Sequence, residues 1–258
     1  MNTARLLKNA KLNYLPTSEN NHYTFASIYA LSIYPIDTVY TFIPKNACSS
    51  LRYSVAVANG FLSEISDIEW IHYNNQTFIA TQREIALAKY TFVVLRCPYT
   101  RVASCFLDLI VSGVFDFKDS AGKKLSISFH DFLLIIQSQG RDQRDQHWRN
   151  QSDFLHYEKY DDYFSLELFS SAINSLDAQG FIVHDTRGTL NHDLSNFNRI
   201  DGNFSKSKEV DIKRIKEKGD APTYRSMFGD EEIKLVNDIY KDDIALYKSH
   251  FGEKKLLF

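Results

Sequence analysis

The sequence is short of the features that mark a secreted or membrane-spanning protein. It contains only three cysteines in 258 residues, an odd number without the spacing of a disulfide framework. It has no run of about 18 apolar residues, the length that a transmembrane helix needs. Its N-terminus, MNTARLLKNAKLNYLP, has too short an apolar segment for a signal peptide. We therefore expect reduced thiols, a cytoplasmic location and no stable insertion into a membrane.

A strong charge of one sign is also missing. The chain has 30 Lys and Arg against 32 Asp and Glu, for a formal net charge of −2. A protein that binds nucleic acid without specificity usually carries a large positive charge, so we expect no nucleic-acid partner. A polyanionic substrate would need a local basic patch, for which the lysine-rich residues 206–218 are the candidate.

The common metal and nucleotide motifs are absent as well. The sequence has no H-E-x-x-H, no C-x-x-C and no group of His and Asp residues with the spacing of metal ligands, so we expect no metal. It also lacks the Walker A pattern G-x-x-x-x-G-K-[ST] of many nucleotide-binding proteins. A kinase-like phosphoryl transferase is therefore a poor fit.

Apolar stretches with strand and helix patterns alternate along the chain, and 44% of its residues are hydrophobic. We predict an α/β fold, a single domain whose mainly parallel central sheet is flanked by helices. Residues 1–37 are interpreted as an N-terminal arm and extension, with residues 1–21 loose, and residues 38–258 as the domain. No internal repeat and no low-complexity linker divides that domain.

The stretch Thr38–Leu51, TVYTFIPKNACSSL, has the pattern of a buried strand, a short loop and a helix. Pro44 ends the strand, and the helix would bury Leu51. Such a loop presents backbone N–H groups and a helix N-terminus to an anion. Lys45 adds a positive charge, and Ser49 and Ser50 add hydroxyl groups that could also cap the helix. The pattern predicts a turn, similar in role to a P-loop, that binds phosphate or sulfate.

A second stretch, Thr91–Leu95, is a buried strand that leads into RCPYTRVAS. Pro98 suits the first turn of a helix, which would carry Ser104. Arg96 follows the strand directly, so it would lie at the carboxyl edge of the sheet, where open α/β sheets bind ligands.

Together IPKNACSSLR and VLRCPYTRVASCFLD resemble the sulfotransferases, in particular the Golgi-type carbohydrate sulfotransferases and their bacterial relatives. The resemblance implies transfer of a sulfuryl group from 3′-phosphoadenosine 5′-phosphosulfate (PAPS) to a carbohydrate hydroxyl. It assigns the 5′-phosphosulfate to the loop residues Lys45, Asn46, Ala47, Cys48, Ser49 and Ser50. It assigns the 3′-phosphate to Arg96 and Ser104.

Two further segments resemble the same enzymes less closely. Asp145–Trp148, DQHW, is similar to their E/D-x-H-W element, and residues 239–247 are similar to their last helix. The Golgi enzymes carry an N-terminal anchor that this sequence does not show, which favours a cytoplasmic protein of bacterial type.

Sulfuryl transfer to a hydroxyl needs a base, and histidine titrates closest to neutral pH. His72 lies between the two motifs, where some relatives place a catalytic histidine, and is our first candidate. His147 is the second candidate and Glu69 a third. His130, His156, His184, His192 and His250 carry no motif, and we interpret them as surface or structural residues.

The acceptor cannot be named from the residues. A carbohydrate is what the resemblance implies, and a non-carbohydrate hydroxyl is the alternative. A protein that binds the nucleotide without catalysing transfer is a second alternative, which the presence of both His72 and His147 disfavours.

Overall fold

The computed structural model describes residues 4–11, 14–186 and 196–258. The chain forms two compact units, the first from Met1–Arg96 and Gln151–Arg187, and the second from Cys97–Asn150 and Gly188–Phe258. The predicted boundary between an arm ending at residue 37 and a domain over residues 38–258 stays a prediction.

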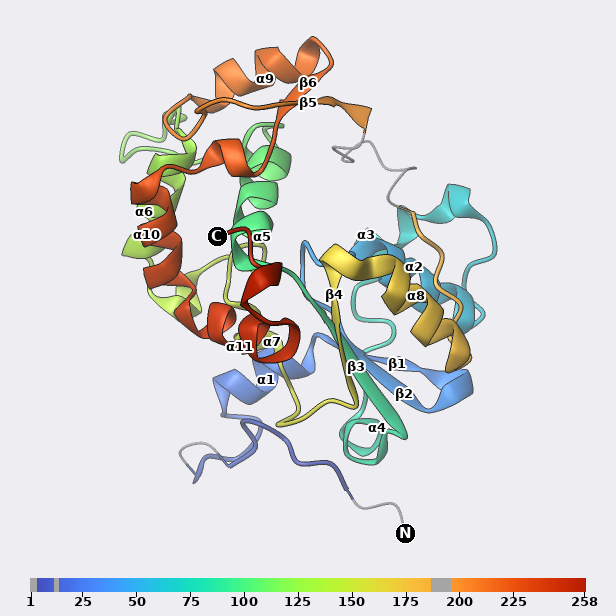
Figure 1. The fold of residues 1–258 in the computed structure, drawn as a ribbon. Helices are drawn as coiled ribbons and strands as arrows, with labels where there is room; N and C mark the ends of the chain where they lie inside the picture. Colours follow the sequence, from blue (N-terminus) through green and yellow to red (C-terminus); the bar gives the residue numbers. More distant parts are fainter. Residues whose placement is uncertain (1–3, 12–13, 187–195) are drawn as a thin grey trace. The chain divides into compact units, whose positions relative to one another are not determined.

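The first unit is built on a four-stranded sheet of β1 (Ala30–Ile33), β2 (Thr38–Thr41), β3 (Tyr90–Leu95) and β4 (Asp162–Ser165), in that order (Figure 1). β1 is antiparallel to β2, while β2, β3 and β4 are parallel. In the parallel pairs Thr38 faces Tyr90, and Phe92 faces Asp162. The predicted α/β class with a mainly parallel sheet and flanking helices is confirmed.

Helices cover this sheet. They are α1 (Asn21–Ser27), α2 (Cys48–Ala58), α3 (Trp70–Tyr73), α4 (Gln82–Leu87), α7 (Gln151–Phe154) and α8 (Phe169–Ala178). Short 3₁₀ turns span Tyr34–Ile36, Ile65–Asp67 and Leu166–Leu168. α2 packs against β1 and α3, and α8 packs against β4. β2 and most of β3 are buried, which agrees with the apolar run of residues 92–95, whereas β4 is only partly buried.

Aromatic stacking joins the two central strands. Tyr40 of β2 and Phe92 of β3 are fully buried, with ring centroids 4.9 Å apart and ring planes 17° apart. Leu51 and Val55 on the predicted inner face of α2 are buried as well. The core thus fixes the directions of β2 and β3, and with them the positions at which the two strands end.

The second unit is mainly helical. It contains α5 (Pro98–Cys105), a π-helical segment (Phe106–Ile110), α6 (Phe129–Ser138), α9 (Glu209–Glu217), α10 (Asp230–Ile239) and α11 (Lys241–Phe251). It also has a parallel pair, β5 (Asn198–Ile200) with β6 (Asp220–Pro222), and 3₁₀ turns at Arg141–Gln143, Arg225–Met227 and Glu253–Lys255. α10 packs against both α5 and α6, and α11 also contacts α5.

The sequence pattern predicts one amphipathic helix over residues 230–251, a short strand over residues 181–184 and a loose arm over residues 1–21, and the structure differs from all three. Residues 230–251 form two helices, because Tyr240 leaves helical geometry (φ −117°, ψ 26°) and its hydroxyl donates a hydrogen bond to Trp148 O at 2.7 Å. Residues 181–184 form no strand. Residues 4–11 are not a loose arm, because Arg5 pairs with Asp161 at 2.7 Å. Residues 1–3 and 12–13 of that arm lie outside the described residues.

Within the described part of the chain, no helix combines the length and the apolar character that crossing a bilayer requires.

His156 is a structural residue of the first unit, as predicted for a histidine without a motif. It is buried, and its ring packs against Tyr23 with centroids 4.9 Å apart. Its Nε2 atom has no hydrogen-bond partner. Burial lowers the pKa of His156 from 6.5 to about 4, so the folded protein holds this imidazole neutral.

This burial predicts a loss of stability in acid. Below a pH of about 6.5 the unfolded chain protonates His156 while the folded protein resists, so stability falls as the pH drops towards about 4. A shift of this size corresponds to about 3 kcal/mol. His156→Phe should remove that part of the slope when urea unfolding is measured from pH 7.5 to pH 4.5. An unchanged slope would show that His156 does not control it.

Candidate functional site

The loop between β2 and α2, residues 42–47 and here called the donor loop, has an unusual backbone. Lys45 has φ 71° and Ala47 has φ 57°, both in the left-handed region that residues other than glycine seldom adopt. Such a conformation costs about 1–2 kcal/mol per residue. Alternating right- and left-handed residues turn successive N–H groups towards one concave side, which is a common anion-binding arrangement. The strain therefore points to a binding role.

No side chain caps the first turn of α2. The prediction that Ser49 or Ser50 could cap this helix is wrong, because the helix begins at Cys48 after a left-handed Ala47. The first helical N–H bond is that of Leu51, which donates to Ala47 O at 3.1 Å. Since the preceding N–H groups have no acceptor within the helix, they suit an anion at the helix N-terminus.

A buried amide network holds this loop against the end of β3. Asn46 Nδ2 donates to Val94 O at 2.9 Å and to Gln151 Oε1 at 2.6 Å. Gln151 Oε1 also accepts from the Arg96 N–H at 2.9 Å, while Gln151 Nε2 donates to Arg96 O at 2.9 Å. Gln151 thus bonds a residue of each predicted donor motif, Asn46 and Arg96. The Asn46 amide group is hydrogen-bonded within the protein.

The Arg96 side chain reaches the same loop. It is 8% exposed, and its Nη1 donates to Lys45 O at 2.9 Å. Two of the residues predicted from separate motifs are therefore in contact at the carboxyl edge of β2 and β3. Open parallel sheets bind their ligands at this edge.

Ser50, in the first turn of α2, has a different environment from the residues of the donor loop. It is buried, its hydroxyl lies 3.0 Å from that of Thr186, and it accepts from the Thr186 N–H at 3.1 Å. One turn later, Ser54 accepts from the His184 N–H at 2.8 Å. These bonds attach residues 184–186 to α2. Cys48 and Ser49 are half-buried at the start of the helix.

Arg52, on the second turn of α2, fixes the segment that carries His72. Its Nη2 donates to Ile71 O and to Asn75 Oδ1, and its guanidinium lies 5.2 Å from the centroid of the Phe42 ring. Burial lowers the pKa of Arg52, although Cys48 and Tyr40 act in the opposite direction. A single cation therefore connects the start of the donor loop to the residues around His72.

The two candidate bases have different surroundings. The His72 side chain is 46% exposed in α3, and its Nε2 lies 3.9 Å from Glu69 Oε2, too far for a hydrogen bond. His147 belongs to the second unit, where its Nδ1 lies 2.7 Å from Asp145 Oδ1. Burial acts to raise the pKa of Asp145, but hydrogen bonds from His147 lower it overall. His147 thus has a carboxylate at hydrogen-bonding distance.

Ser104 also belongs to the second unit, where it is buried within α5. Its predicted partnership with Arg96, the last residue of the first unit before α5, stays a prediction. Trp148 is 1% exposed, and its ring packs against Phe115 at 4.9 Å. As a core residue, Trp148 cannot stack on a ligand. His192 lies outside the described residues.

One group of residues in the described part of the chain has metal-ligand geometry. It consists of His130, Glu231 and Glu232, whose ligand atoms lie within 4.8 Å of one another. These charges already have partners: Lys206 pairs with Glu231 at 2.9 Å, and Glu232 lies 2.6 Å from His130 Nδ1 and accepts from the Gly229 N–H. These residues form ion pairs that join α6 to α10.

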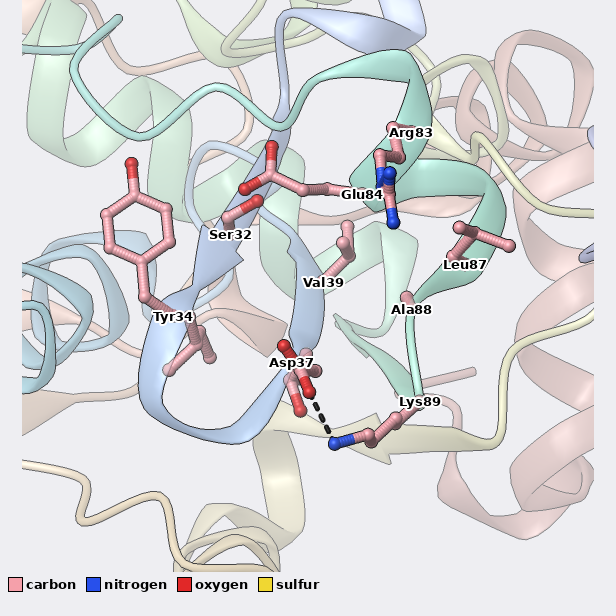
Figure 2. Close-up of a pocket in the computed structure, with 11 residues that line it drawn as sticks. Ser32, Tyr34, Asp37, Val39, Arg83, Glu84, Leu87, Ala88 and Lys89 are labelled. Carbon is pink, nitrogen blue, oxygen red and sulfur yellow. Dashed lines mark ion pairs between the residues drawn. The ribbon is translucent and has the colours of Figure 1, made fainter. Parts of the chain in front are cut away.

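A cavity of about 430 Å³ lies at the opposite edge of the sheet, where β2 and β3 begin. Figure 2 shows the Asp37–Lys89 ion pair on its wall. Its lining residues are Ser32, Ile33, Tyr34, Asp37, Thr38, Val39, Arg83, Glu84, Leu87, Ala88 and Lys89. None of the predicted site residues is among them, so this cavity is separate from the donor loop.

A family model described as the sulfotransferase family matches residues 37–250. The chain belongs to the sulfotransferase family. Comparison with curated proteins and with solved structures gives no significant match. The matched range includes both predicted motifs and residues of both units, and membership supports an enzyme that transfers sulfuryl groups to an acceptor.

Within this sulfotransferase, Gln151 is the residue that the sequence did not reveal. It lies in the polar run GRDQRDQHWRNQSD, whose composition is typical of a solvated surface. Instead it is 1% exposed and bonded to Asn46 and Arg96. Only its place next to the DQHW segment could have drawn attention to it.

The network around Gln151 predicts a large effect of Gln151→Leu. Leucine has a similar size but leaves the Asn46 amide and the Arg96 N–H and C=O without this partner. Each buried polar group that loses its partner costs about 1–3 kcal/mol. We expect the free energy of unfolding in urea to fall by about 3 kcal/mol or more. Gln82→Leu, at an exposed position of α4, is the matched control, and an equal effect of both would contradict the proposed network.

Proposed function

We propose that this sulfotransferase transfers a sulfuryl group from PAPS to a hydroxyl group of a carbohydrate. The observation that carries the proposal is the donor loop, in which the left-handed Lys45 and Ala47 precede an uncapped α2. Arg96 contacts this loop from the end of β3. Backbone N–H groups and two cations at one edge suit a donor that carries a phosphosulfate and a second phosphate.

In this proposal the donor lies along the carboxyl edge of the sheet. The 5′-phosphosulfate binds the backbone N–H groups from Ala47 to Ser50, with Lys45 beside the sulfuryl group. The 3′-phosphate binds Arg96, whose planar guanidinium can meet two phosphate oxygens, and Ser104. The Ser50 side chain already bonds within the protein, so Ser50 contributes its backbone N–H to the donor. Asn46 fixes the shape of the loop, because its side chain bonds Val94 O and its N–H donates to Ile43 O at 3.2 Å.

The reaction is an in-line displacement at sulfur. The acceptor oxygen forms a bond to sulfur while the bond from sulfur to the bridging phosphate oxygen breaks, and adenosine 3′,5′-bisphosphate leaves. The hydroxyl proton moves to the base. Negative charge grows on the bridging oxygen, where Lys45 and the loop N–H groups stabilise it. The leaving group is a stabilised phosphate, so these residues suffice without a metal.

We assign the general base to His72, because Arg52 connects its segment to α2 and to the start of the donor loop. His147 is the second candidate. A carboxylate that accepts a hydrogen bond from Nδ1 leaves Nε2 to accept a proton, and Asp145 is suitably placed. The kinetics of His72→Ala and of His147→Ala distinguish these two assignments.

Nucleotide binding tests the proposal against its alternatives. Adenosine 3′,5′-bisphosphate should raise the thermal stability, by about 2.7 kcal/mol at a hundredfold excess over Kd. Stabilisation by ATP and Mg²⁺ instead would favour a phosphoryl transferase. Stabilisation by adenosine 3′,5′-bisphosphate without transfer of labelled sulfate to any acceptor would favour a binding protein. Transfer to tyrosine peptides or small alcohols alone would favour a non-carbohydrate acceptor.

We further propose a cytoplasmic location, which fractionation of the source cells would test.

Lys45→Ala should abolish transfer while the protein stays folded. A group that meets charge developing in the transition state typically contributes about 10²–10³ in rate. Single-turnover transfer of labelled sulfate measures the loss. Lys159→Ala, at an exposed position of the same unit, should keep full activity. A Lys45→Ala enzyme with a near-normal kcat would contradict the proposed function.

Arg96→Ala should weaken binding of adenosine 3′,5′-bisphosphate more than binding of AMP. A hydrogen bond to a charged group contributes roughly 1.5–3 kcal/mol, and AMP lacks the 3′-phosphate that would lose it. Because Arg96 also bonds Lys45 O, both nucleotides should lose some affinity. Calorimetry on this variant and on the Arg83→Ala control measures the difference. Equal losses for the two nucleotides would show that Arg96 does not bind the 3′-phosphate.

His72→Ala should lower kcat by about 10²–10⁴ and leave the Kd of the donor nearly unchanged, because a base acts on the chemical step. It should also remove the fall in rate at acidic pH. His147→Ala should change KM more than kcat. The reverse pattern, with the acid limb lost only in His147→Ala, would assign the base to His147 and its Asp145 partner.

A further inference from the structure

The segment between α2 and α4, residues 59–81, displays aromatic side chains at the surface. Tyr73 is 86% exposed and Phe61 is 55% exposed. Phe61 packs against Trp70, with centroids 6.0 Å apart, and against the buried Phe78 at 4.9 Å. The Phe61 ring is thus held in place by two neighbouring rings. We call the exposed part of residues 61–76 the acceptor surface.

This surface is acidic. No lysine or arginine occurs between Arg52 and Arg83, whereas Glu64, Asp67 and Glu69 do, and all three are exposed. Among the described residues, neither Glu64 nor Asp67 forms an ion pair. Burial raises the pKa of Tyr53, and these two carboxylates raise it further, as expected for negative charge that no cation offsets.

The acceptor surface is attached to the donor loop. Arg52 bonds Ile71 and Asn75 within or beside α3, and its guanidinium lies over Phe42, where the donor loop begins. His72, the proposed base, lies between these two anchored positions. An acceptor bound here would present a hydroxyl near the base from the side of α3.

Half of the six cations in the lysine-rich residues 206–218 are paired with carboxylates of their own unit. Lys206 pairs with Glu231 at 2.9 Å, Lys208 with Asp131 at 2.8 Å, and Arg214 with Asp211 at 3.0 Å. These pairs reduce the positive charge that this segment offers to a polyanion.

We propose that the acceptor is a glycan without anionic groups, which binds the acceptor surface next to His72. This inference rests on the proposed sulfuryl transfer and narrows its substrate class. The C–H face of a sugar ring is apolar and packs against Tyr73 and Phe61, while its hydroxyl groups donate hydrogen bonds to the carboxylates. A uronate or a sulfate would instead meet three like charges.

The same charges assist the end of the reaction. Transfer converts a neutral hydroxyl into a sulfate ester, which carries a negative charge beside Glu69 and its neighbours. Repulsion then favours release of the product and disfavours rebinding of glycans that are already sulfated. The acceptor surface therefore selects against its own product.

Intrinsic fluorescence can report on this surface directly, because the chain has two tryptophans and Trp148 is buried. In Trp148→Phe, Trp70 is the single reporter. Neutral oligosaccharides such as glucans and N-acetylated hexosamine polymers should change its emission in the presence of adenosine 3′,5′-bisphosphate. Uronate-containing counterparts should bind at least about tenfold more weakly at low salt, with a difference that shrinks as salt screens the charges. If Trp148→Phe does not fold, iodide quenching of the parent protein reports on Trp70.

Variants connect the signal to named residues. Tyr73→Ala should weaken binding of the neutral glycan about three- to tenfold, while Tyr14→Ala, at a tyrosine that is 98% exposed and lies outside the acceptor surface, should not. The double change Glu64→Lys and Asp67→Lys should improve binding of the uronate glycans. Wild-type affinities in both variants would overturn the proposal.

Two other results would also overturn it. The first is tighter binding or faster sulfation of polyanionic glycans by the parent enzyme. The second is salt-sensitive binding of a basic tyrosine peptide in preference to any glycan. Both leave sulfuryl transfer from PAPS intact, whereas failure of the proposed function appears separately, as a lack of stabilisation by adenosine 3′,5′-bisphosphate.

Discussion

The side chain of Gln151 is the contact on which the candidate donor site depends. One amide group binds the backbone of Arg96 on both sides and the side chain of Asn46. These two residues follow the paired strands β3 and β2, whose ladder ends at Thr41 and Val93, before either residue. Beyond that point Gln151 holds the two residues together, because its bonds are buried and their geometry tolerates little change.

This arrangement explains how the donor loop keeps its strained backbone. Left-handed Lys45 and Ala47 persist only if the surrounding structure holds them. Asn46 between them is tied to Val94 and Gln151, and Lys45 O accepts from Arg96. The N–H groups are therefore oriented before any ligand arrives. Preorganised groups of this kind stabilise developing charge without a cost of rearrangement during the reaction.

Local signals in the sequence predicted the local structure well. The apolar runs before Pro44 and Arg96 became β2 and β3. The pattern Ser128-x-x-Asp131, which is typical of a helix N-terminus, forms the capping box of α6. The α/β class followed from these patterns, and the resemblance to sulfotransferases followed from the two motifs. Each of these predictions depends on residues that are close together along the chain.

What the sequence did not predict depends on contacts between distant residues. β4 was missed because it is short and only partly buried, and its place is fixed by pairing with β3. The helix over residues 230–251 is broken where Tyr240 bonds a carbonyl 92 residues away. Gln151 and Trp148 lie in a polar run that would normally be solvated, yet both are buried. Polarity alone cannot distinguish a solvated amide from one bonded to two loops.

Charge separates the two substrates in the proposed reaction. The donor loop supplies N–H groups and Lys45, and Arg96 lies beside it at the end of β3. These groups suit a nucleotide with several negative charges. The acceptor surface has three carboxylates and exposed rings, which suit an uncharged polyol. Arg52 lies at the boundary, where its Nη2 donates to Ile71 O and to Asn75 Oδ1, so this cation is held by the segment that carries His72. A donor misplaced on the acceptor side would thus be repelled, so each substrate is directed to its own side of the donor loop.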